Sequence, residues 1–181
     1  MHRRIALGFR AHSGWAAAVA VSGSFELPDV LERRRLALAQ GPRQPYHAAE
    51  PLPFSEAEAL ILRCRVEALE LAVAAIEELR RAFAAKSAGV LVGRPRPLPP
   101  LPAILKSHAA IHTAEGVFYR EVMIDACQLC GLRVARVPEK EIAARVSDLP
   151  RLGPPWTADE KLATLAALAT LVPRGAASSG S

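Results

Sequence analysis

The feature that most constrains the fold is a long helix-type pattern in the middle of the chain. Ser55 and Glu58 have the spacing of a capping box at a helix start. Apolar residues then recur every three or four positions, at Leu62, Val66, Leu69, Val73, Ile76 and Phe83. This spacing predicts one amphipathic helix over residues 56–85. It also suits a coiled coil, but a single helix between strands more often packs on its own sheet.

Strand-type segments flank this helix. Residues 5–10 and 15–22 are apolar runs that predict a β-hairpin with a slightly long loop. Residues 30–39 form a third strand, whose charged middle suits a sheet edge. Residues 41–53, with four prolines, are expected to be an irregular loop. Residues 88–93 and 132–137 predict two further strands, joined through helices and therefore parallel to their neighbours.

Three helices complete the pattern. The second begins near Ala103 or Ser107 and ends at Cys130, where Gly131 provides a C-cap. A third is predicted over residues 139–149. A second capping box, Thr157 with Glu160, opens the last helix, which runs to about Leu171. The element order therefore predicts an α/β protein with a five-stranded mixed sheet.

The bulk properties set the class of protein. The chain has 181 residues, a net charge of +5 and no run of about 20 apolar residues. We expect one domain over residues 1–172, a cytoplasmic location, no membrane association and an anionic partner. Residues 171–175 match a thrombin cleavage sequence, so residues 173–181 are expected to be a disordered tail of partly engineered origin. Cys127 and Cys130 are interpreted as buried thiols at a helix end.

Three short motifs resemble one family. They are Leu7-Gly-Phe-Arg-Ala-His-Ser-Gly-Trp15, Val90-Leu-Val-Gly-Arg-Pro95 and the strand over residues 132–141 with its Pro-Glu-Lys-Glu end. Together with the element order they resemble the ribonuclease H-like superfamily, in its bacterial Holliday-junction resolvase branch. The resemblance implies the strand order 3-2-1-4-5 with helices on both faces of the sheet.

The resemblance also implies where chemistry would occur. Family members hydrolyse phosphodiesters with two metals held by carboxylates at strand one, near strand four or five, and at the last helix. Here Arg10 occupies the strand-one position, and Gly93 and Arg94 end strand four. Acids remain only after strand five and at the last helix: Glu139, Glu141, Asp159 and Glu160. Because an arginine repels a divalent cation by several kcal/mol at close range, we expect no two-metal nuclease chemistry and no metal or cofactor.

The same edge of the sheet is expected to bind an anion instead. Arginine offers a planar fork that suits phosphate or carboxylate, and amides at a helix N-terminus add to it. The residues predicted for this anion site are Arg10, His12, Ser13, Arg94, Arg96, Lys106 and Lys161.

His108, His112 and Glu115 are the candidate catalytic residues, because they lie on one face of the second helix. They could bind zinc, but a polar network at the helix end is favoured. Glu115 could equally pair with Arg120 or Arg10, and Tyr46 and His47 are interpreted as a loop contact.

Two functions therefore stay open. One is a ribonuclease H-like module that binds nucleic acid through phosphate. The other is an enzyme for a small phosphorylated or carboxylated substrate, with a histidine as general acid or base. The sequence is compatible with a dimer but does not fix the oligomeric state.

Overall fold

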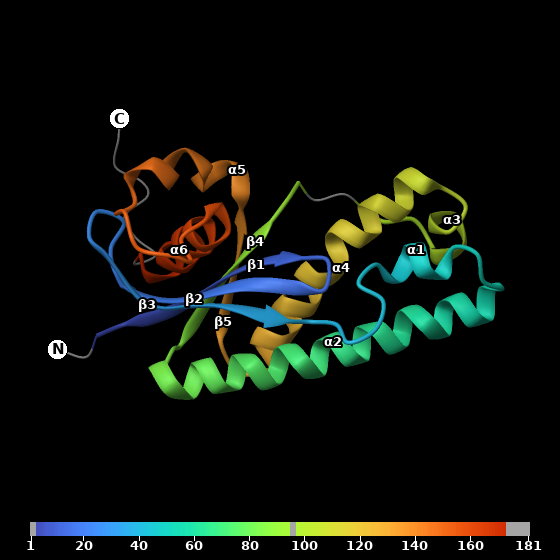
Figure 1. Cartoon of the computed structure of the whole chain (residues 1–181), viewed down its shortest axis with the longest axis horizontal. Helices are drawn as coiled ribbons and strands as arrows, with labels where there is room; N and C mark the ends of the chain where they lie inside the picture. The colour runs from blue at the N-terminus through green and yellow to red at the C-terminus, as the bar shows by residue number, and fades with distance from the viewer. Residues whose placement is uncertain (1–2, 95–96, 173–181) are drawn as a thin grey trace.

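A computed structural model describes residues 3–94 and 97–172, which form one five-stranded sheet with helices on both faces (Figure 1). The strands are β1 (Ile5–His12), β2 (Trp15–Gly23), β3 (Pro28–Ala37), β4 (Ser87–Val92) and β5 (Arg133–Pro138). Their order is β3-β2-β1-β4-β5. β1, β2 and β3 pair antiparallel, whereas β4 pairs in parallel with both β1 and β5. The predicted mixed sheet and its strand order are confirmed.

The hairpin between β1 and β2 is tighter than predicted. His12 still pairs with Trp15, so only Ser13 and Gly14 form the turn. Gly14 has a φ of 78°, a conformation that glycine adopts at low cost in a two-residue turn. The predicted longer loop is therefore wrong. β3 lies at the sheet edge as predicted, but it begins at Pro28 and ends at Ala37.

Two layers of helices cover the sheet. The helical segments are α1 (Pro45–Ala49), α2 (Phe54–Phe83), α3 (Leu101–Ile104), α4 (His108–Leu129), α5 (Glu139–Ile142), a 3-10 segment η1 (Ala143–Asp148) and α6 (Ala158–Leu171). α2 and α4 pack together on one face, and α6 covers β1, β2 and β4 on the other (Figure 1). The predicted helix over residues 139–149 is thus divided between α5 and η1, and the predicted irregular loop over residues 41–53 contains α1.

The start of α2 differs from the prediction. The Pro53 carbonyl accepts hydrogen bonds from the amides of Glu56 and Ala57, so the helix begins at Phe54. No side chain caps it. The predicted capping box of Ser55 and Glu58 is therefore wrong, because Ser55 already lies inside the helix.

The buried face of α2 was predicted in part. Of the predicted apolar series, Ile76 is buried and Leu69, Val73 and Phe83 pack against the core, but Leu62 and Val66 are 60% and 48% exposed. The buried positions are mostly small: Ala57, Ile61, Cys64, Ala68, Ala72, Ile76 and Leu79. Small side chains let α2 approach α4 and the sheet closely, and that packing decides which side of the helix faces inward.

The other two long helices follow the prediction. Ser107 caps α4 by accepting from the Ala110 amide, and Ile111, Phe118 and Val122 are buried. Gly131, with a φ of 72°, follows its end. In α6 the predicted capping box is formed, since the Thr157 amide and hydroxyl both donate to Glu160 at 2.7 Å.

Two paired glycines set the position of α6. Gly8 of β1 and Gly89 of β4 lie side by side in the parallel register. A Cβ on Gly8 would lie 1.9 Å from the Ala163 carbonyl oxygen, and one on Gly89 would lie 2.0 Å from that of Ala166. The helix backbone therefore rests directly on the sheet backbone. This contact brings the first turn of α6 to the carboxyl end of β1.

In the described part of the chain no helix combines the length and hydropathy needed to cross a membrane. The predicted tail over residues 173–181 and the candidate Arg96 lie outside the described residues.

Candidate functional site

The candidate site lies where the parallel strands end. Phe9 of β1 pairs in parallel with Val90 of β4, so Arg10 and Arg94 leave the sheet at the same edge, as predicted. β5 is parallel to β4 and leads into Glu139 at that edge. The first turn of α6 supplies Asp159.

The Arg10 side chain bridges two of the four acids predicted at this edge. One guanidinium nitrogen donates to Asp159 at 2.7 Å and the other donates to Glu139 at 3.1 Å. The Arg10 and Asp159 side chains are 24% and 23% exposed, so the pair is largely shielded from water. Arg10 was predicted to hold an external anion, but its guanidinium is already engaged by carboxylates of the chain itself.

His12 and Trp15 hold the end of the hairpin against α6. The Nε2 atom of His12 lies 3.0 Å from an Asp159 oxygen. Its ring stacks on Trp15 with centroids 4.3 Å apart, and the Arg35 guanidinium lies over the same indole, 3.7 Å from its centroid. Stacking and cation–π contact fix the Trp15 side chain.

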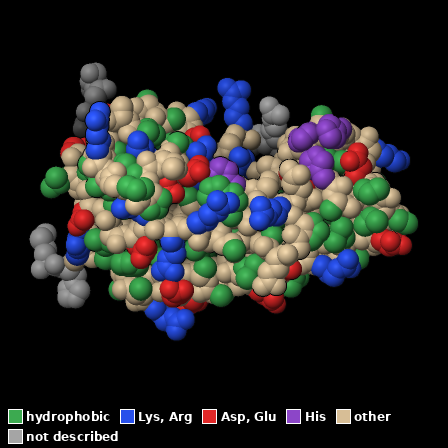
Figure 2. All heavy atoms as spheres, viewed as in Figure 1, with side chains coloured by type: hydrophobic (Ala, Val, Ile, Leu, Met, Phe, Trp, Pro, Cys, Tyr) green, Lys and Arg blue, Asp and Glu red, His purple; other side chains and the backbone are tan. Residues whose placement is uncertain are grey.

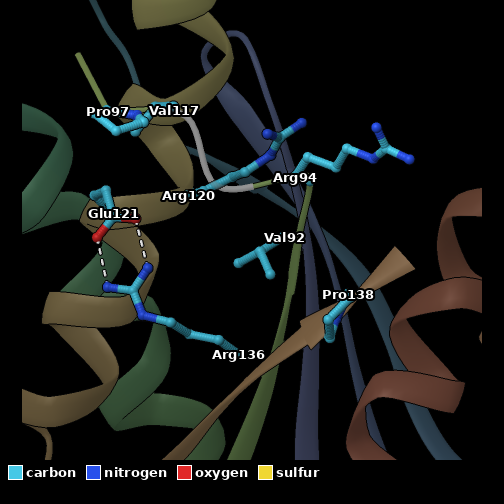
Figure 3. A pocket seen from close by; sticks show the side chains of 9 residues that line it. Val92, Arg94, Pro97, Val117, Arg120, Glu121, Arg136 and Pro138 are labelled. Carbon is cyan, nitrogen blue, oxygen red and sulfur yellow. Dashed lines mark hydrogen bonds and ion pairs between the residues drawn. The ribbon is translucent and has the colours of Figure 1, made fainter. Parts of the chain in front are cut away.

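A hollow of about 520 Å³ opens beside β4 (Figure 3). Its apolar lining includes Val92, Val117 and Pro138, and its charged residues come from β4, β5 and α4: Arg94, Arg120, Glu121 and Arg136. Arg136 and Glu121 form a two-pronged ion pair at 2.6 and 2.7 Å, which lowers the pKa of Glu121 from its ordinary value.

Arg94 and Arg120 are the available cations of this region. Both line the first hollow and a second one that continues to His112 and Thr113. Within residues 3–94 and 97–172 neither arginine has a carboxylate partner, and Figure 3 draws no interaction from either guanidinium. This pair can therefore accept an oxyanion from outside the chain.

Sequence reasoning did not place Arg120 in the anion site and considered it only as one possible partner of Glu115. A signal was present, because His112, Gly116 and Arg120 follow one another at four-residue intervals on α4. All three line the second hollow.

Three histidines form a cluster apart from the Arg10 corner, by which we mean Arg10 with His12, Glu139 and Asp159. His108 and His112 lie in the first two turns of α4, and His47 of α1 meets them (Figure 2). The Nε2 atoms of His108 and His112 are 3.0 Å apart, and one ligand atom from each of the three rings lies within 4.8 Å of the others. His47 had been interpreted only as a loop contact.

Glu115 holds α1 in place beside these histidines. It is 7% exposed, and its Oε1 accepts from the amides of Tyr46 and His47 at 2.7 and 3.1 Å. The proposed pairing of Glu115 with Arg120 or Arg10 is therefore wrong. Burial, followed by the negative charge of Glu115, raises the pKa of Tyr46.

The remaining predicted residues are dispersed. Ser13 lines a hollow with Arg43, Gln44 and His47. Lys106 is exposed just before α4 and lines none of the hollows described above, and Lys161 is half-buried in the first turn of α6. The structure thus brings Arg10 and His12 to one cluster, Arg94 to a second and the histidines of α4 to a third.

Comparison with known proteins finds no matching family model and no matching curated protein. Solved structures do match. RuvC of Thermus thermophilus, in complex with a Holliday junction substrate, superposes with a TM-score of 0.53 at 11% identity, over 91% of this chain and 90% of that one. A second T. thermophilus RuvC structure gives 0.52 at 12% identity, over 91% of each chain. The chain has a ribonuclease H-like fold.

In this ribonuclease H-like fold, the carboxyl edge of the sheet carries an internally paired cluster and a neighbouring cationic one. Arg10 contacts one oxygen of Glu139 and one of Asp159, and it offsets one of their two negative charges. Arg94 and Arg120 present positive charge to solvent. This arrangement can bind phosphate or carboxylate groups without a metal ion.

Proposed function

We propose that this protein is a ribonuclease H-like module that binds nucleic acid through phosphate contacts and lacks the two-metal nuclease chemistry of the resolvase branch. The binding residues are Arg94 and Arg120, with Lys106 as a further phosphate contact. Arg10 has a different role, which is to replace a metal as the counter-charge of the remaining acids.

The observation that carries the proposal is the position of Arg10 between Asp159 and Glu139. Mg²⁺ requires carboxylate oxygens that are free to approach it at about 2.1 Å. The Arg10 guanidinium engages one oxygen of each of these carboxylates and also repels a divalent cation. Without bound metals, the protein would not hydrolyse phosphodiesters by the two-metal route.

Phosphate binding is supported by charge and by the neighbour. The chain has a net charge of +5, and the two arginines beside β4 have no internal acid within the described residues. The T. thermophilus RuvC that shares the fold is in complex with a Holliday junction substrate. We therefore infer that a DNA backbone crosses the edge of the sheet near Arg94.

Fluorescence anisotropy against a four-way DNA junction and a duplex, over a range of salt concentrations, tests this. The logarithm of affinity should fall linearly with the logarithm of salt concentration, by about 0.9 per phosphate contact. Arg94→Ala and Arg120→Ala should each reduce that slope by about 1 and weaken binding to both DNAs.

Arg63→Ala is the matched control, since Arg63 is exposed on α2 and lines none of the hollows described. It should bind as the parent does. A slope near zero, or equal losses in all three variants, would reject the proposed phosphate contacts. Cleavage of the junction that depends on Mg²⁺ would reject the absence of nuclease chemistry.

A second candidate is an enzyme for a small anionic substrate. It is favoured by His112 and Thr113, which line the hollow that also contains Arg94 and Arg120. There an imidazole could act as general acid or base beside a bound oxyanion. Turnover of a phosphate ester that His112→Ala abolishes and His12→Ala preserves would support this candidate over DNA binding.

A further inference from the structure

We propose that His47, His108 and His112 form a binding site for one transition-metal cation of the zinc class. The site is separate from the Arg10 corner and does not depend on the proposed function. It joins α1 to the first two turns of α4.

The spacing of the three rings suits such an ion. Zinc binds imidazole nitrogen at about 2.0–2.1 Å, so two ligands of a tetrahedral ion lie roughly 3.3 Å apart. The Nε2 atoms of His108 and His112 are 3.0 Å apart, which is close to that separation. One ring nitrogen of His47 lies within 4.8 Å of the ligand nitrogens of His108 and His112. Since 4.8 Å exceeds that separation by about 1.5 Å, a shift of His47 of this size or less would complete a three-histidine set.

The ring packing already directs the imidazoles toward one another. The ring centroid of His47 lies 5.6 Å from that of His108 and 4.8 Å from that of His112, and the rings meet edge to face. Helical spacing of i and i+4 places His108 and His112 on one side of α4, and α1 brings His47 against it. Little rearrangement is therefore needed for binding.

Glu115 provides the outer support that metal-binding histidines commonly have. Its Oε1 lies 3.4 Å from the Nδ1 atom of His47, so the Nε2 atom is the nitrogen of that ring left to bind a cation. A carboxylate on the far nitrogen fixes the ring and makes it a better ligand.

The charge of Glu115 provides a second, independent observation. The side chain is 6% exposed, and its Oε2 has no hydrogen-bond partner among the described residues. A buried carboxylate without full compensation is costly. A cation held by His47 would place positive charge directly behind the ring that Glu115 contacts.

Three protein ligands leave a fourth position for water or an anion. The neighbouring hollow contains Arg94 and Arg120, whose charges disfavour a bare cation. A bound anion in the fourth position would reduce that repulsion. Imidazole ligands favour Zn²⁺, Co²⁺ and Ni²⁺ over Mg²⁺.

The test uses the full chain and two probes, Zn²⁺ in competition with a chromophoric chelator and Co²⁺ by visible absorption. One Zn²⁺ should bind per chain, and Co²⁺ should give the intense visible bands of a four-coordinate ion. His47→Ala, His108→Ala and His112→Ala should each lower zinc affinity at least about tenfold. Glu115→Gln should lower it by about 10–100-fold.

His12→Ala is the matched control, because it removes an imidazole that contacts Asp159 instead. It should keep the parent affinity. Zn²⁺ should also raise the melting temperature of the parent but not that of His47→Ala. The melting temperatures of the metal-free variants show whether each one folds.

The decisive comparison is between His47→Ala and the parent. A helical histidine pair can bind zinc weakly without any third ligand. Unchanged affinity in His47→Ala would therefore overturn the three-histidine site, as would the absence of saturable binding to the parent.

Discussion

At the scale of single residues, Arg10 determines the chemistry of the carboxyl edge. Its place in the first strand was predictable, because residues 5–10 form a run of strand length. Its partners were not. Glu139 and Asp159 are 129 and 149 residues away in the chain, and only the packing of β5 and α6 brings them to the same guanidinium.

Replacement of Arg10 by an acid should turn this ion-paired cluster into a cluster of carboxylates that can bind a metal. In Arg10→Asp, three carboxylates would face one another, so the variant should lose about 1–3 kcal/mol of stability in the absence of metal. Mn²⁺ or Mg²⁺ should then restore part of it. At metal concentrations about ten times the dissociation constant, the gain is about 1.4 kcal/mol.

Thermal denaturation with and without the metal measures this effect. Arg10→Met is the control, because it removes the cation without adding a ligand, and its metal-dependent shift should be the smaller. Equal shifts in the parent and in Arg10→Asp would contradict the assigned role of Arg10.

The histidines show the limit of residue-level prediction. The i, i+4 spacing of His108 and His112 is visible in the sequence, but their third neighbour comes from a loop of unpredicted conformation. Glu115 follows on the same helical face and was therefore grouped with them. It turns inward to the amides of α1 instead, because α1 presents donors that no other group in the region satisfies.

At the scale of elements, the contact between α6 and the sheet restricts the sequence most, because it leaves no room for a side chain at two positions. Gly8 and Gly89 have no space for a methyl group, since backbone carbonyls of α6 lie where it would be. Gly8→Ala and Gly89→Ala should each cost about 3 kcal/mol, at the upper end of overpacking effects. Urea denaturation measures the loss.

Gly116→Ala is the matched control for these substitutions. Nothing lies within 4 Å of the added methyl group, and the residue is inside α4. The change should be neutral or stabilise by up to about 1 kcal/mol, because alanine favours a helix. If Gly8→Ala unfolds at the same urea concentration as Gly116→Ala, the close contact is not as described.

Elements were predicted well where local signals and packing agree. The second capping box and the inward face of α4 are confirmed. α2 is a mixed case, because Leu62 and Val66 in its first half are exposed whereas Ile76 in its second half is buried. Hydrophobic periodicity identified the helix but not every residue of its buried face.

At the scale of the whole molecule, the mixed sheet followed from connectivity, whereas its strand order and the two helical layers were implied by the resemblance to the ribonuclease H-like superfamily. Parallel crossovers through long helices leave few arrangements of a five-stranded sheet. The clusters on its edge could not be predicted to the same extent. They depend on angles between helices and strands that the sequence pattern does not contain.

The three cysteines provide a probe of this whole structure. Cys64, Cys127 and Cys130 all belong to the core between the sheet, α2 and α4. Burial raises the pKa of each thiol, that of Cys130 to about 11. The protonated form therefore persists to higher pH, and at pH 8 about one Cys130 in a thousand is a thiolate.

An aromatic disulfide reagent should consequently react with the native protein at least about 100-fold more slowly than with a small thiol. In strong denaturant all three thiols should react at once. Rapid labelling of the native chain at pH 8 would show that this core opens independently of global unfolding.

The pair Gly8 and Gly89 under α6 also has a consequence for how substitutions can change the residues around Asp159. Because backbone meets backbone there, the two glycines fix how closely α6 lies against β1, and the side chains of Arg10 and His12 then contact Asp159. A substitution at position 10 would therefore change the partner of Asp159 without changing where the helix lies on the sheet.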